Sequence, residues 1–115
     1  MTAKHIYLRF LNIVHALEGG NNAPTMDLDA KKLLEMIFVR YAEDKPMTVT
    51  DAIALSQIAS PATIHRKLDQ LRELGMIDTA FEGKNRRTKY LVPTQIAHDY
   101  FESIGQAMNQ AMNPA

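Results

Sequence analysis

The side chains best suited to binding another molecule lie in residues 60–78. Ser60 is a good helix N-cap and Pro61 suits the first helical position, so a helix is predicted to begin here and to end before Gly75. One face is apolar, and the other carries the hydroxyl, amide and cationic groups that contact base edges and phosphates. That second face consists of Ala62, Thr63, His65, Arg66, Lys67, Asp69 and Gln70. The simpler interpretation is an ordinary solvated helix face.

A second group of cations lies further along the chain, in a segment with β-strand character. Residues 76–81 alternate in polarity, residues 87–92 are rich in strand-forming types, and a loop signal lies between them. These segments predict a β-hairpin whose tip and returning strand carry Lys84, Asn85, Arg86, Arg87 and Lys89. Such cations can bind the sugar-phosphate backbone, or they can simply protect an exposed sheet edge from aggregation.

The residues before Ser60 predict two helices that would position this face. The first runs from about residue 27 to 42, with carboxylates in its first turn. Thr48 and Asp51 have the spacing of a capping box, with Asp in place of the usual Glu or Gln, and begin a short helix over about residues 49–56. About four residues then lead to Ser60. Two short capped helices with a tight link predict a helix-turn-helix, a pattern that a small helical bundle would share.

Helices are also predicted at both ends of the chain, over residues 5–17 and 95–111, with a loop at 18–24 after the first. Pro93 stops the second strand and Thr94 caps the last helix. These terminal helices carry more apolar side chains than one small core needs, which predicts a homodimer interface. The excess apolar residues are Tyr7, Leu8, Leu11, Phe101, Ile104 and Met108.

Length, composition and charge restrict the classes of protein to which this chain can belong. A chain of 115 residues with 46% hydrophobic residues is expected to form one domain, residues 1–115. Within it we expect an N-terminal helix in 1–18, a binding core in 27–93 and a C-terminal helix in 94–112. The formal net charge is zero, but residues 60–92 carry seven basic and four acidic side chains, a net +3. The absence of cysteine excludes disulfides and fits a cytoplasmic protein. The N-terminus resembles neither a signal peptide nor a membrane span.

No arrangement expected of an enzyme is present in the sequence. The four histidines lie on separate predicted elements without metal-ligand spacing between them. No glycine-rich phosphate loop follows a strand, and no nucleophile motif occurs. We therefore expect no catalytic residue, no bound metal and no cofactor.

In chain order, the predicted elements are a helix, a second helix, a helix-turn-helix, a hairpin and a last helix. This order resembles the winged helix-turn-helix of bacterial transcription regulators, and within that class the MarR family. The resemblance covers about residues 27–100 and rests on 48–54, 60–68, 71–77, Arg86-Arg87 and Pro93-Thr94. It implies a mainly α fold with a small β-hairpin (α+β class) and N- and C-terminal helices. Two features depart from the family: Asn85 stands where its wing usually has Asp, and one C-terminal helix stands where two usually build the dimer.

Together, the motifs and the resemblance predict a sequence-specific regulator that binds double-stranded DNA, acting as a dimeric repressor. The predicted base-edge contacts are Thr63, Arg66 and Gln70, with Ala62 and His65 near them. Ser60 and Lys67 are predicted to contact phosphate. Lys84, Arg86 and Arg87 are predicted to contact the backbone or the minor groove. The alternatives are a winged helix that binds another protein and a plasmid or phage replication-type DNA-binding protein. The sequence assigns no small-molecule effector.

Overall fold

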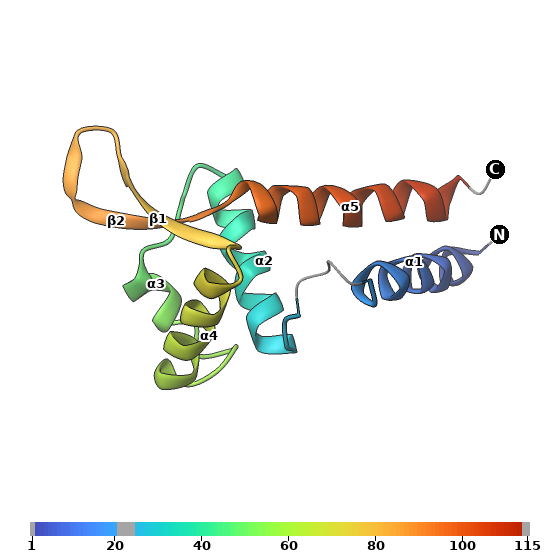
Figure 1. Ribbon diagram of the computed structural model, residues 1–115, viewed down its shortest axis with the longest axis horizontal. Helices are drawn as coiled ribbons and strands as arrows, with labels where there is room; N and C mark the ends of the chain where they lie inside the picture. The colour runs from blue at the N-terminus through green and yellow to red at the C-terminus, as the bar shows by residue number, and fades with distance from the viewer. Residues whose placement is uncertain (1, 21–24, 114–115) are drawn as a thin grey trace. The chain divides into compact units, whose positions relative to one another are not determined.

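The computed structural model describes residues 2–20 and 25–113, and in these ranges it contains five helices and one two-stranded antiparallel hairpin (Figure 1). The predicted mainly α fold with a small hairpin is confirmed. Of the predicted loop at 18–24, residues 21–24 lie outside the described ranges. The elements are α1 (Ala3–Glu18), α2 (Leu28–Ala42), α3 (Val49–Ile53), α4 (Pro61–Glu73), β1 (Ile77–Glu82), β2 (Asn85–Pro93) and α5 (Gln95–Met112).

The elements form two compact units, which we call the central unit (residues 26–97) and the terminal unit (residues 1–25 and 98–115). In the central unit, α2 packs against α4 and β2, and α3 packs against α4. Its core is built from apolar side chains of all these elements, and this packing fixes the position of α4 and of its outer face. The largest fully buried side chains of this core are Leu33, Leu34, Ile37, Met47, Ile64, Leu71, Met76 and Leu91.

The predicted helix caps are confirmed. Ser60 caps α4, where the backbone N–H of Thr63 donates to its Oγ at 3.3 Å. Thr48 and Asp51 form the complete capping box of α3. Thr94 caps α5 by accepting a bond from the N–H of Ala97 at 3.3 Å. Each cap satisfies helix N–H groups that have no partner within the helix, so local sequence is enough to mark these boundaries.

The prediction for the link between α3 and α4 was wrong in length. The third helix was expected to reach about residue 56, but α3 ends at Ile53, so the link spans residues 54–60. Tight turns occupy this link, because the N–H groups of Leu55 and Ile58 bond to carbonyls three residues back. These bonds satisfy the backbone without continuing the α-helix.

The hairpin is confirmed, and it is joined by a segment that the sequence did not reveal. Ile77 pairs with Pro93 and Phe81 with Lys89, but Glu82 pairs with Asn85, which leaves residues 86–88 as an irregularity in the returning strand. Gly83 adopts a φ of 58°, a left-handed conformation that glycine adopts without strain. Residues before α3 extend the sheet on its other side, because the N–H of Leu91 donates to the carbonyl of Met47 at 2.7 Å.

The terminal unit consists of α1 and the part of α5 that begins at His98. The two helices run in opposite directions, and Nε of Arg9 donates to the carbonyl of Ala111 at 3.3 Å (Figure 1). Among the described residues of this unit, only Val14, Ala107 and Ala111 are buried. Within residues 2–20 and 25–113, no helix is long and apolar enough to cross a membrane.

Candidate nucleic-acid interface

The outer face of α4 exposes most of the side chains that the sequence singled out. Ala62, His65, Arg66 and Gln70 are exposed, whereas Thr63 and Lys67 are half-buried at the edge of the face. The opposite face of α4 is held in the core by Ile64, Leu68 and Leu71. Because these three side chains fix the rotation of the helix, they also fix which groups point outward.

Three of the predicted contact residues form a hydrogen-bonded row on α4. Oγ of Ser60 donates to Oγ1 of Thr63 at 3.1 Å, and Nη2 of Arg66 donates to the same oxygen at 3.1 Å. The row restrains the Arg66 side chain while most of its guanidinium donors stay available to an outside acceptor. A restrained guanidinium suits bidentate contact with guanine, because less rotamer entropy is lost on binding.

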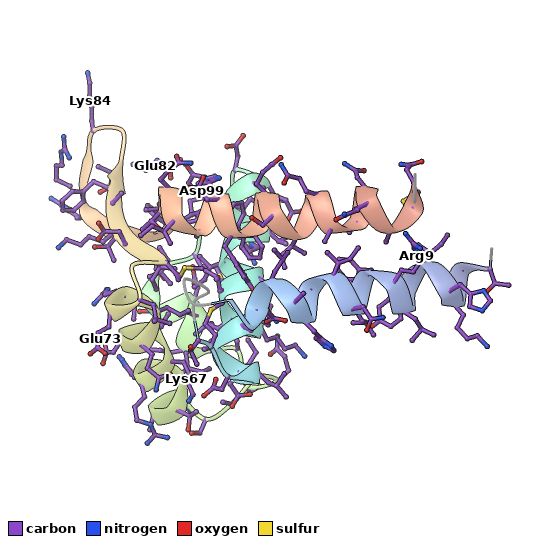
Figure 2. The ribbon with its side chains drawn as sticks, turned by 45° about the vertical axis from the view of Figure 1, so that its right-hand side comes forward. Arg9, Lys67, Glu73, Glu82, Lys84 and Asp99 are labelled. Carbon is purple, nitrogen blue, oxygen red and sulfur yellow. The ribbon has the colours of Figure 1, made fainter. Side chains whose placement is uncertain are left out.

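Lys67 lies differently from the other cations of the candidate interface. Lys67 lies on α4, where Figure 2 labels it. Its ammonium forms an ion pair with Oδ2 of Asp27, the N-cap residue of α2, and its side chain is only 16% exposed. The other carboxylate oxygen of Asp27 accepts the N–H of Ala30 at 2.9 Å. The Lys67 ammonium and, next, the Ala30 N–H hold the pKa of the Asp27 carboxyl below its ordinary value.

The hairpin tip, residues 83–89, carries the second group of predicted contact residues. Lys84, Asn85, Arg86, Arg87 and Lys89 are all exposed, and Figure 2 shows Lys84 at the end of the hairpin, pointing away from it. Within the described part of the chain, none of the four cations makes an ion pair. Their charge is therefore not neutralised by any carboxylate of residues 2–20 or 25–113.

Two cation–π contacts and one hydrogen bond shape this tip. Cζ of Arg86 and Nζ of Lys89 lie 5.4 Å and 5.7 Å from the ring centroid of Phe81, within the range of cation–π attraction. Asn85, which stands where the family usually has Asp, accepts the backbone N–H of Arg87 at 2.9 Å. This bond fixes the backbone of the turn and leaves the Arg87 guanidinium out of it.

The structure brings together the α4 face and the hairpin as parts of one unit, but it does not bring the histidines together. In the described ranges, no three His, Asp or Glu side chains form a group able to hold a metal ion. Sequence reasoning missed Asp27 as a partner of the α4 face and placed it only at a helix start. The carboxylate at the N-terminus of α2 was the only signal, and it does not point to a cation 40 residues away.

Known proteins resemble this chain in fold and not in sequence. No family model matches the chain, and no curated protein matches it. A crystal structure of a MarR-like transcriptional regulator from Thermotoga maritima superposes with a TM-score of 0.64 at 15% identity, covering 97% of this chain and 79% of that one. The crystal structure of the YusO protein from Bacillus subtilis gives a TM-score of 0.55 at 15% identity, covering 95% and 69%. The chain therefore has the winged helix-turn-helix fold of a MarR-like transcriptional regulator.

Proposed function

We propose that this protein is a transcriptional regulator that binds double-stranded DNA by sequence. The observation that carries the proposal is the hydrogen-bonded row of Ser60, Thr63 and Arg66 on the exposed face of α4. A helix face needs fixed donors to distinguish base edges in the major groove, and this row supplies them. The MarR-like regulator among the structural neighbours supports the same conclusion.

In this proposal, α4 enters the major groove and the hairpin tip contacts the backbone or the adjacent minor groove. Thr63, Arg66 and Gln70 contact base edges, Ala62 and His65 lie beside them, and Ser60 contacts phosphate. Lys84, Arg86, Arg87 and Lys89 supply charge, and Asn85 holds the turn. The protein needs no catalytic residue, metal or cofactor for this role.

We further propose a homodimeric repressor of the cytoplasm, joined through the terminal unit. Tyr7, Leu8 and Met108 are 58%, 49% and 53% exposed. With three buried side chains among its described residues, the terminal unit has little core of its own, and a second copy would cover this apolar surface. Sedimentation at micromolar concentration tests the interface. A monomer at every concentration would refute it and would limit each protein to one half-site.

DNA binding is tested by fluorescence anisotropy with a random duplex, followed by selection of bound sites from a pool of random duplexes. We expect salt-dependent binding to the random duplex and enrichment of a two-fold symmetric site. Binding without enrichment would contradict sequence recognition. The absence of any salt-dependent binding would refute the proposal and favour a winged helix that binds another protein.

A further inference from the structure

Asp27 connects the start of α2 to the middle of α4. One carboxylate oxygen caps α2 through the N–H of Ala30, and the other binds the ammonium of Lys67. The two residues are 40 positions apart in the chain. The Asp27 side chain is 51% exposed, whereas that of Lys67 is 16% exposed, so the carboxylate is the more solvent-accessible member of the pair.

This arrangement affects what Lys67 can contribute to DNA binding. A lysine on a recognition helix strengthens binding when its ammonium neutralises a phosphate and releases a condensed counterion. The Lys67 ammonium is already neutralised by the Asp27 carboxylate, which is ionised at neutral pH as any solvent-accessible aspartate is. Arg66, one position earlier, is bound to the uncharged hydroxyl of Thr63 and keeps its full charge.

We propose that Asp27 withholds Lys67 from the DNA backbone and thereby lowers the affinity of the α4 face for DNA of any sequence. This inference rests on the proposed DNA-binding function and changes the role that the sequence predicted for Lys67. Phosphates occur in every duplex, so a masked lysine reduces binding to random DNA as much as binding to the preferred site. Specificity then depends on groups that read bases, such as Arg66, because their contribution is not matched on random sequence.

A carboxylate that only held α2 against α4 would behave differently. Removing such a structural bridge would weaken folding or disturb the orientation of α4, and affinity would fall without a gain in salt dependence. Removing a masking carboxylate would instead raise affinity and steepen the salt dependence. The two roles therefore change DNA binding in opposite directions.

The decisive variant is Asp27→Asn, because asparagine is also a good N-cap and can still accept the N–H of Ala30. Affinity is measured by anisotropy on a random duplex across a salt series. We expect the plot of log affinity against log salt to become steeper by about 0.9 per protomer, which is the value for one added phosphate contact. The affinity advantage of Asp27→Asn over the unchanged protein should then fall about 3.5-fold between about 50 and 200 mM salt.

Two matched controls complete the experiment. Lys67→Met alone should leave the salt slope unchanged, because the masked ammonium contributes no counterion release. The double variant Asp27→Asn/Lys67→Met should not show the steeper slope of Asp27→Asn. Circular dichroism of each variant verifies the fold, and Asp27→Ser, which also keeps a cap, replaces Asp27→Asn if that variant does not fold.

The outcomes separate this inference from the proposed function. If the unchanged protein binds DNA but Asp27→Asn has the same or a shallower slope, the inference is overturned and the proposed function stands. A slope that falls by about 0.9 in Lys67→Met alone would also overturn it, since Lys67 would then neutralise a phosphate. If the unchanged protein binds no duplex at all, the proposed function fails and the inference fails with it.

Discussion

The α4 face and the hairpin tip differ in how their polar side chains are held. On α4, Ser60, Thr63 and Arg66 are linked to one another by side-chain hydrogen bonds, and the helix is fixed by a buried stripe. At the tip, Asn85 fixes the backbone turn, while the cations are exposed and unpaired with carboxylates of the described residues. Linked donors suit the reading of base edges, and exposed charges without carboxylate partners suit contact with the phosphate backbone. This difference predicts that specificity and affinity can be altered separately.

The largest expected effect is a loss of discrimination when Arg66 is removed. Arg66→Ala should weaken binding to the preferred site by about 1–3 kcal/mol more than binding to a random duplex, the cost of one bidentate base contact. Parallel anisotropy titrations on the two duplexes measure this difference. Equal losses on both would mean that Arg66 binds phosphate, and α4 and the tip would then act alike.

Removing two cations from the tip should reduce affinity without changing specificity. Arg86→Ala/Arg87→Ala should flatten the salt slope by nearly two units per protomer, at about 0.9 for each phosphate that the protein no longer neutralises. Specific and random duplexes should be weakened equally, and unfolding free energy should change by no more than about 0.5 kcal/mol, because these side chains are exposed. An unchanged slope and affinity would remove the tip from the DNA interface.

A smaller effect is expected when the α4 row is interrupted at its centre. Thr63→Val preserves the shape of the side chain but removes the oxygen that accepts bonds from Ser60 and Arg66. Thr63→Val removes both the restraint on Arg66 and the base-edge contact proposed for Thr63 itself. We expect binding to the preferred site to weaken by about 1 kcal/mol, the typical net value of a neutral hydrogen bond, with little change in salt slope. Thr88→Val, at a half-buried position of the hairpin, is the matched control. A loss as large in the control would show that the row has no special role.

The smallest effect concerns the pH dependence of stability. Lys67 lowers the pKa of Asp27 from its ordinary 3.8, so the ion pair stabilises the fold above pH 3.8 and is lost as pH falls through the lower folded-state pKa. The difference in unfolding free energy between the unchanged protein and Lys67→Met should therefore shrink at acidic pH. Urea titrations at several pH values measure it. A difference that is independent of pH would show that Lys67 acts through packing and not through charge.

The sequence by itself determined the elements whose signals are local. Three helix starts are marked by a cap that accepts a hydrogen bond from a backbone N–H in the first turn, so they follow from residue type and spacing alone. The caps are Ser60 before Pro61, Thr48 with Asp51, and Thr94 after Pro93. The hairpin follows from alternation around the turn at Gly83. The candidate site residues of α4 and the tip were predicted in the same way, from residue types on an apolar-backed helix and an exposed turn.

The tertiary structure alone decided which partner each of these groups meets. The segment at Met47 joins β2, and Asp27 pairs with Lys67, through contacts that span about 40 residues of chain. No local pattern encodes such pairs, because they depend on how α2 packs against α4 and β2 in the core. The length of α3 also depended on turns formed after Ile53. Sequence periodicity identifies the outward face of α4, but only long-range packing decides that Lys67 meets a carboxylate while the Arg66 guanidinium keeps donors available to an outside acceptor.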